Sequence, residues 1–311
     1  MKLGMYVLYV VVLSIAPNTA LTAETASRPA SRPARSRQRG SIRWVNARGR
    51  IPEIPRVEHR TYDSKAMNLK VGVTVYTPPG YEDGAKRYPV LYWLHGVNGN
   101  EWNYLGWFTT AHEPTGRPKR SIGESDNVIS LQEKKKVPPM IVVFVNGGRG
   151  SGYRDRGDVK SETTIVRELI PFIDKNYRTI ASREGRAIEG FSMGGSGSLS
   201  LYAKYPDLFC SVVGYAGYLR EDGVSRLKKT QSEGKYPLHV RLAAGSLDRA
   251  SYRDFHTVLQ KAGIPHDYEV IEGVGHNIYE VYQKAGLTGL LFHVKVLRPA
   301  YKDKPQPGKD E

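Results

Sequence analysis

A short segment, residues 190–195 with the sequence Gly-Phe-Ser-Met-Gly-Gly, places a serine between glycines two positions before it and two positions after it. The segment follows an apolar stretch typical of a strand and opens a stretch with helical spacing. On such a tight turn the serine backbone is strained and only small neighbours fit, so the hydroxyl projects above the positive end of the following helix. The pattern predicts Ser192 as the nucleophile of an acyl-transfer reaction.

A serine nucleophile requires a base to take its proton and an acid to orient that base. Two later strand-like stretches each end in a loop that holds a residue of the required type. Asp248 follows residues 238–244, and His276 follows residues 268–271 in a glycine-containing loop. The chain order Ser192, Asp248, His276 is that of the α/β-hydrolases. We therefore expect these three side chains to form a catalytic triad.

The sequence leaves alternatives for the acid and for the base. Asp248 also has the position of a helix cap, because a helix is expected to begin near Ser251. The competing acids and the nearest competing histidines are Asp254, Glu272, His256 and His266. Asp248 and His276 are favoured because each directly follows a strand, at the edge of the sheet where Ser192 is expected.

The negative oxygen of a tetrahedral intermediate needs two backbone N–H donors. One is expected from Met193, directly after the nucleophile. The other is expected from Val97, in the loop that follows an earlier strand. His95 in the same loop is interpreted as a structural residue rather than as a second base.

Aromatic residues follow two of the expected strand ends. Trp102, Tyr104 and Trp107 come after the loop of Val97. Tyr153 comes after a glycine-rich strand end. At the rim of a pocket such rings stack on a sugar or on a feruloyl ring. We expect Trp102, Trp107 and Tyr153 to bind substrate, with packing of the loops as the alternative.

Apolar stretches alternate with helical stretches over most of the chain. The expected strands cover residues 69–76, 88–94, 140–145, 186–191, 211–214, 238–244 and 268–271, and the expected helices cover residues 163–177, 194–205, 221–233, 251–262 and 278–285. With 40% hydrophobic and 25% charged residues, the composition is that of a globular protein. The alternation predicts an α/β fold with a mostly parallel sheet and helices on both faces, in one domain from about 55 to 297.

The first 23 residues have the pattern of a secretory signal peptide. A lysine at position 2 precedes a 13-residue apolar run, and small residues follow the run. The run is shorter than the roughly 20 residues that span a bilayer. We expect cleavage after residue 20 or 23 and export of the protein, with an uncleaved anchor as the alternative. Residues 298–311 are expected to form a polar tail.

About half of the net charge of +15 lies in the first 50 residues. Residues 24–54 contain eight arginines against two acidic residues, in a tract rich in Ser, Pro and Ala. Such a tract buries too little apolar surface to fold, so we expect a disordered linker rather than a specific nucleic-acid-binding surface. The single cysteine, Cys210, excludes an internal disulfide and a cysteine-based zinc site.

Several segments together resemble one known family. They are YTPPGYEDGAKRYPVLYWLHGVNGNEWNY, ELIPFIDKNYRT, RAIEGFSMGGSGSLSLYAKYPDLF and GVGHN. The chain resembles the esterase D / feruloyl esterase group, also called carbohydrate esterase family 1, over about residues 55 to 295. This group includes acetylxylan esterases and the antigen 85 acyltransferases. The resemblance implies an α/β-hydrolase fold with nucleophile Ser192, acid Asp248, base His276 and oxyanion amides of Val97 and Met193. It implies neither a metal nor an organic cofactor.

These observations predict a secreted or periplasmic serine carboxylic-ester hydrolase that works through an acyl-enzyme. Its expected substrates are acylated carbohydrates or small esters, with feruloyl or acetyl groups on polysaccharides favoured by the export signal. An acyltransferase of the same fold and a non-catalytic secreted binding protein are the alternatives. Neither a specific nucleic-acid partner nor a stable membrane span is expected, and the sequence leaves the oligomeric state open.

Overall fold

The computed structural model describes residues 42–49, 53–103, 105, 128–133 and 135–302. The chain divides into two units, residues 1–40 and 41–311, and all described residues belong to the second unit. The expected signal peptide and most of the expected linker therefore lie outside the described residues. Within the described part, the helices are too short or too polar to cross a membrane.

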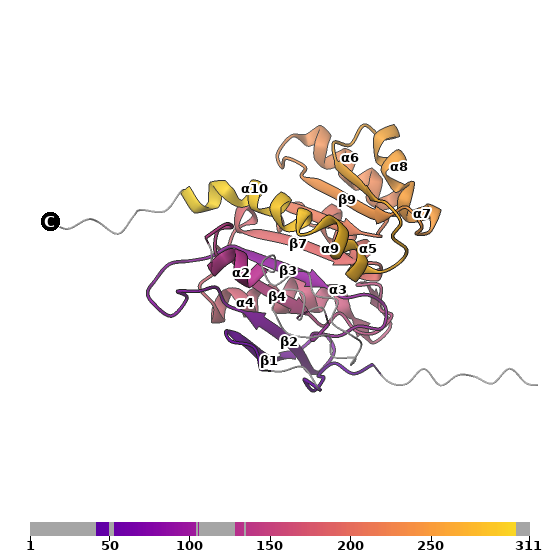
Figure 1. Ribbon diagram of the computed structural model, residues 1–311. Helices are drawn as coiled ribbons and strands as arrows, with labels where there is room; N and C mark the ends of the chain where they lie inside the picture. Colours follow the sequence, from indigo (N-terminus) through magenta and orange to yellow (C-terminus); the bar gives the residue numbers. More distant parts are fainter. Residues whose placement is uncertain (1–41, 50–52, 104, 106–127, 134, 303–311) are drawn as a thin grey trace, which may run out of the picture. The chain divides into compact units, whose positions relative to one another are not determined.

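An eight-stranded sheet forms the centre of the second unit, with the strand order β1-β2-β4-β3-β7-β8-β9-β10 (Figure 1). Its strands are β1 (Val57–Ser64), β2 (Leu69–Tyr76), β3 (Val90–Leu94), β4 (Ile141–Val145), β7 (Arg186–Phe191), β8 (Ser211–Tyr215), β9 (Val240–Gly245) and β10 (Asp267–Ile271). β2 pairs antiparallel with β1 and β4, and all other neighbours are parallel. The strands β5 (Asp155–Arg156) and β6 (Val159–Lys160) form a separate hairpin.

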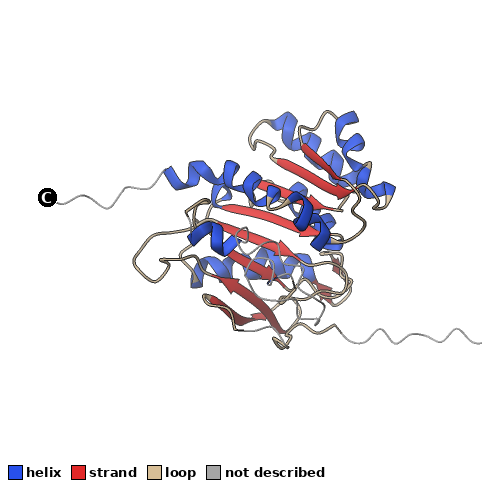
Figure 2. Cartoon of the chain, in the orientation of Figure 1, coloured by secondary structure: helices blue, strands red, loops and turns tan. Residues whose placement is uncertain are grey.

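Helices cover both faces of this sheet (Figure 2). The described helices are α2 (Val128–Glu133), α3 (Ser161–Thr163), the π-helix η1 (Thr164–Leu169), α4 (Ile170–Asn176), the 3-10 turn η2 (Arg183–Gly185), α5 (Met193–Lys204), α6 (Glu221–Glu233), α7 (Ala250–Arg253), α8 (Phe255–Lys261), α9 (Ile278–Ala285) and α10 (Thr288–Lys302). One apolar core joins the sheet to η1, α4, α5, α6 and α8. A second core joins the other face to α2, α9 and α10.

The central strands are apolar on both sides because both faces are covered. In β3, Tyr92 belongs to the first core and its neighbour Trp93 to the second, and both side chains are almost fully buried. The parallel strands end at one edge of the sheet, so the loops that follow β3, β7, β8, β9 and β10 gather there. This arrangement confirms the predicted α/β-hydrolase fold.

Most expected elements match the observed ones within a few residues. The helix expected over 251–262 is two short helices, α7 and α8, and the helix expected over 163–177 begins at residue 161 and contains a π-helical stretch. The strand β1 and the helix α10 were not expected. α10 runs through residue 302, past the expected domain end at 297.

The domain also begins earlier than the expected boundary at residue 55. Trp44 is buried in the first core, and its carbonyl oxygen accepts a 2.6 Å hydrogen bond from the Gly72 amide. Residues 42–49, assigned by composition to the linker over 24–54, thus pack on the sheet. The buried indole supplies the apolar surface that the surrounding polar tract lacks.

A fully buried carboxylate, Glu101, holds this N-terminal segment in place. Its Oε1 accepts hydrogen bonds from the Asn46 amide at 2.8 Å and lies 3.1 Å from His59 Nε2. Its Oε2 accepts from the side-chain amides of Asn46, at 3.0 Å, and of Asn146, at 2.9 Å. These bonds replace the water that burial removes from the carboxylate. Glu101 therefore connects three segments that are distant in sequence.

We predict that Glu101→Ala lowers the free energy of unfolding by about 3 kcal/mol, because it leaves several buried polar groups unpaired. Urea denaturation followed by circular dichroism measures the change. Glu53→Ala is the matched control, because the Glu53 side chain is 92% exposed. Its effect should stay within about 0.5 kcal/mol. Equal effects of the two substitutions would contradict the anchoring role of Glu101.

Candidate active site

Ser192 lies on a sharp turn between β7 and α5. Its backbone angles, φ 59° and ψ −115°, fall in a region that residues with a side chain rarely adopt. A Cβ on Gly194 would lie 2.0 Å from the carbonyl oxygen of Leu94, and one on Gly190 would lie 2.7 Å from the same atom. Only glycine fits at both positions, which explains the motif. The turn is held by a 2.8 Å hydrogen bond from the Ser192 amide to the carbonyl of Tyr215.

The structure brings Ser192, His276 and Asp248 together. His276 Nε2 is 2.8 Å from Ser192 Oγ. On the other side of the ring, His276 Nδ1 lies 3.1 Å from Asp248 Oδ1 and 3.0 Å from Oδ2. The Asp248 side chain is 1% exposed, whereas that of His276 is 38% exposed. The imidazole can thus exchange protons with a bound molecule while a buried carboxylate fixes its orientation.

The loops of Asp248 and His276 are bonded to each other. The amide of Leu247 donates to the carbonyl of Val274 at 2.9 Å, and a Cβ on Gly245 would lie 2.0 Å from the same oxygen. The two loops follow the paired strands β9 and β10. The acid and the base are therefore positioned by backbone contacts between neighbouring strand ends.

The competing residues have other partners. Glu272 is hydrogen-bonded to Ser246 Oγ at 3.0 Å, and Asp254 is exposed between α7 and α8. The ring of His256 stacks on Tyr268, with ring centroids 4.1 Å apart. The ring of His266 contacts its own loop through the carbonyl of Ile264. Asp248, rather than Asp254 or Glu272, lies against His276.

The expected oxyanion donors lie in two segments next to Ser192. Met193 is the first residue of α5, where backbone N–H groups have no partner within the helix. Val97 is 50% exposed in the loop after β3, and its carbonyl accepts a 3.1 Å hydrogen bond from Gly150. The amide of Gly152 contacts Met193 Sδ at 3.4 Å. The loop after β4 therefore contacts both segments.

His95 has no access to a substrate. Its ring is buried, with Nδ1 2.7 Å from the Gly96 carbonyl and Nε2 accepting a 3.2 Å hydrogen bond from the Gly147 amide. Burial lowers the pKa of His95 from 6.5 to about 4. The ring is thus neutral at pH 7, with one nitrogen donating and the other accepting. His95 supports the loop of Val97, in agreement with the structural role expected for it.

Two of the three expected substrate-binding residues are buried, which contradicts that expectation. Tyr153 is 1% exposed, and its hydroxyl donates to the His95 carbonyl at 2.9 Å. Trp102 is 8% exposed, stacks on His59 and donates its indole N–H to the carbonyl of Asn46 at 2.9 Å. A ring enclosed in this way offers no face to a ligand, so both side chains pack the loops. Trp107 lies outside the described residues.

Other aromatic residues, missed in the sequence, surround the imidazole of His276. Tyr252 stacks on it with ring centroids 5.3 Å apart and an interplanar angle of 18°, and Phe191 lies at 4.7 Å. The ring centroid of Tyr218 lies 6.1 Å from that of Tyr252, and Tyr218 is 41% exposed. The available signal was weak: Phe191 directly precedes Ser192, and Tyr252 follows Asp248 by four residues, in α7. Phe191 and Tyr252 therefore give the imidazole of His276 two aromatic neighbours.

Within the described part of the chain, no group of three or more His, Cys, Asp or Glu residues is arranged to hold a metal ion. Cys210 is buried, and burial raises its pKa to about 11. The thiol is therefore protonated at neutral pH and is a poor nucleophile.

The fold and this arrangement define a serine esterase domain of the α/β-hydrolase class. The Esterase family model matches residues 64–285, so the chain belongs to this family. Esterase Rv1288 of Mycobacterium tuberculosis is 29% identical over 168 residues, which are 52% of this chain and 32% of that protein. The endo-1,4-beta-xylanase/feruloyl esterase of Xylanibacter ruminicola is 28% identical over 229 residues, 71% of this chain and 29% of that protein.

The chain thus spans about a third of the length of these relatives. Among solved structures, a ferulic acid esterase is 25% identical with a TM-score of 0.62, covering 78% of this chain and 98% of that one. A ferulic acid esterase from Anaeromyces mucronatus, 19% identical with a TM-score of 0.58, shares the fold over 78% of this chain and 92% of its own. The predicted esterase D / feruloyl esterase resemblance is confirmed.

We predict that His95 makes the protein sensitive to acid. Below pH 6.5 the unfolded chain binds a proton at His95, whereas the folded chain does so only near pH 4. The free energy of unfolding therefore falls as the pH drops from 6.5 to 4, by about 3 kcal/mol from this residue. Urea titrations at several pH values measure the slope. His95→Gln, which cannot titrate, should show a shallower slope, and equal slopes would contradict the prediction.

Proposed function

We propose that the chain is a serine carboxylic-ester hydrolase that removes feruloyl or acetyl groups from polysaccharides through an acyl-enzyme. The observation that carries the proposal is the 2.8 Å contact between Ser192 Oγ and His276 Nε2, with the buried Asp248 on the opposite ring nitrogen. In this arrangement Ser192 is the nucleophile, His276 the general base and Asp248 the orienting acid.

In the first half of the reaction, Ser192 Oγ attacks the ester carbonyl carbon while His276 Nε2 takes its proton. The electron pair of the C=O π bond moves to the oxygen. The resulting oxyanion accepts hydrogen bonds from the amides of Met193 and Val97. Collapse of the intermediate breaks the bond to the alcohol oxygen, and His276 gives its proton to that oxygen. The product is an ester between the acyl group and Ser192. Asp248 stabilises the imidazolium that forms on the way.

In the second half, water replaces the alcohol. His276 removes a proton from the water, and the resulting hydroxide adds to the acyl carbon. The intermediate then releases the carboxylic acid and returns the proton to Ser192. The 38% exposure of the His276 side chain leaves the base accessible to the water that hydrolysis requires.

The substrate class rests on the surroundings of the triad and on the relatives. The exposed side chains of Val97, Tyr218 and Leu247 follow three different strand ends and provide apolar contact area for an acyl group. The Xylanibacter relative is named as a xylanase and feruloyl esterase in one chain. The signal-like residues 1–23 and the basic tract behind them support action outside the cell, where such polymers are found.

Substitutions in the triad test the mechanism. We predict that Ser192→Ala lowers kcat for methyl ferulate or p-nitrophenyl acetate about 10⁶-fold without unfolding the protein. Asp248→Asn should lower kcat by roughly three to four orders of magnitude, because the imidazole loses the partner that fixes its tautomer. Asp254→Asn is the matched control and should retain wild-type turnover. Loss of activity with Asp254→Asn, or its retention with Ser192→Ala, would refute the assignment.

A panel of esters tests the substrate class. We expect the purified protein to hydrolyse methyl ferulate, acetylated xylan and short p-nitrophenyl esters, with kcat/KM higher for one of the two polysaccharide-derived acyl groups than for a butyrate or longer ester. Product analysis by chromatography in the presence of a sugar alcohol separates free acid from transferred ester. Transfer as the main outcome, or turnover of long-chain esters alone, would overturn the proposed substrate class.

A further inference from the structure

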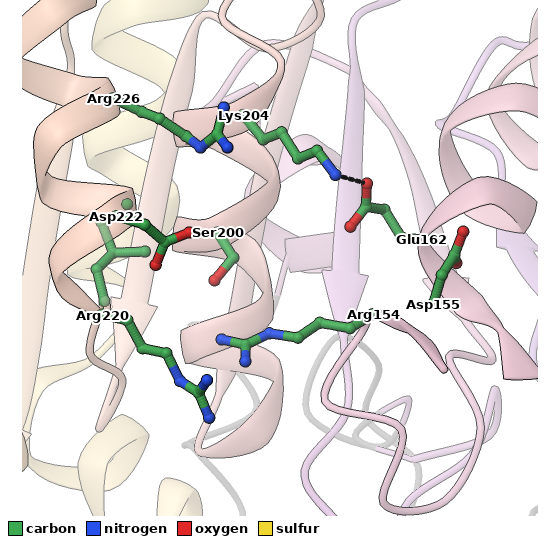
Figure 3. A pocket seen from close by; sticks show the side chains of 10 residues that line it. Arg154, Asp155, Glu162, Ser200, Lys204, Arg220, Asp222 and Arg226 are labelled. Carbon is green, nitrogen blue, oxygen red and sulfur yellow. Dashed lines mark hydrogen bonds and ion pairs between the residues drawn. The ribbon is translucent and has the colours of Figure 1, made fainter. Parts of the chain in front are cut away.

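A cleft lies away from the triad, on the side of α5 that faces α6 and the β5–β6 hairpin (Figure 3). Its volume is about 430 Å³. The residues that line it are Arg154, Asp155, Glu162, Ser200, Lys204, Leu219, Arg220, Asp222, Gly223 and Arg226. In Figure 3, α5 forms the floor, with Arg220 and Arg226 on one side and Arg154 and Glu162 on the other. Most of the lining side chains are charged.

The charges in this cleft are only partly paired within the protein. Lys204 Nζ forms an ion pair with Glu162, and the carboxylate of Asp155 accepts hydrogen bonds from the amide and the hydroxyl of Thr163, at 3.1 and 2.6 Å. In the part of the chain that the structure describes, the three lining arginines form no ion pair. These arginines are Arg154, Arg220 and Arg226. Asp222 is the third acidic residue of the lining, beside Asp155 and Glu162.

Two loops connect the cleft to the turn of Ser192. The loop that carries Arg154 contacts the first residue of α5, through the Gly152 amide and Met193 Sδ. The loop that carries Arg220 contacts the next turn of α5, where the Tyr218 amide donates to Ser196 Oγ at 3.1 Å. Ser200 on the cleft floor is eight residues along α5 from Ser192, or roughly 12 Å at the rise of a helix. An extended ligand can therefore reach both places.

We propose that this cleft binds the carboxylate groups of uronic-acid units on the polysaccharide whose ester is held at Ser192. The inference rests on the proposed function and names the class of its substrate as acidic. Guanidinium groups bind carboxylates through paired, charge-assisted hydrogen bonds. Ser200 and Asp222 offer polar atoms to the neighbouring sugar hydroxyls.

Direct binding tests the cleft without any reaction. The probes are unesterified tetragalacturonic acid and the neutral xylotetraose, titrated into the full-length protein by calorimetry. We expect the acidic tetramer to bind, with affinity that falls as salt rises, and the neutral tetramer to bind at least about tenfold more weakly. Equal affinity for both tetramers, or affinity independent of salt, would overturn the proposal.

Two substitutions on α6 provide a matched pair. Arg226→Gln removes a guanidinium that lines the cleft, and Lys228→Gln removes the same charge two residues further along the same exposed helix. We expect Arg226→Gln to weaken tetragalacturonate binding about tenfold and Lys228→Gln to leave it unchanged. Arg154→Gln on the opposite wall should act like Arg226→Gln. Equal effects of Arg226→Gln and Lys228→Gln would mean a general charge effect and would refute the site.

Kinetics separate this inference from the proposed function. With acetylated oligosaccharides, Arg226→Gln should raise KM for the uronate-bearing substrate and leave the neutral one and p-nitrophenyl acetate unchanged. If the wild type hydrolyses esters but discriminates neither substrate nor tetramer, the cleft proposal alone fails. If the wild type hydrolyses no ester, the proposed function fails, while the binding experiment still decides whether the cleft takes uronates. Inorganic phosphate that binds as tightly as tetragalacturonate would overturn the assignment to sugar acids.

Discussion

The close approach of backbone segments around Ser192 is the constraint on which the rest of the site depends. The turn places the serine at a positive φ, which costs on the order of 1 to 3 kcal/mol for a residue with a side chain. The cost is offset by contacts that only glycines at positions 190 and 194 allow, against the strand end at Leu94. The result is a hydroxyl fixed at the sheet edge, beside the start of a helix.

The other components of the site are positioned in a similar way, by strand ends rather than by long-range side-chain pairing. The loops of Asp248 and His276 are bonded to each other because β9 and β10 are neighbours. Two buried polar side chains stabilise the loop after β3. The neutral ring of His95 bonds to the Gly147 amide, and the carboxylate of Glu101 joins that region to the N-terminal segment. The loops of the site are thus held in place by buried side chains whose hydrogen bonds are satisfied.

Helix α5 links two kinds of chemistry. Its first turn lies beneath the nucleophile, where the helix dipole and the free amides favour a developing negative charge. Its third turn forms part of the floor of the charged cleft. A single rigid element thereby sets the separation between Ser192 and the charged side chains of the cleft. This spacing provides a physical basis for selecting a substrate by a group remote from its ester.

Sequence patterns alone determined the fold class, most strands and the three residues now found in hydrogen-bond contact. They could do so because strand–turn–helix signals are local, and because parallel strand ends share one edge of a sheet. The tertiary structure alone decided which side chains are enclosed. Tyr153 and Trp102 follow strand ends as a substrate platform would, but their rings are buried against His95 and His59. Burial depends on segments distant in the chain, so local spacing does not encode it. The same holds for Trp44, whose polar surroundings in sequence resemble a linker, and for the arginines that gather beside α5 from two separate segments, residue 154 and residues 220–226.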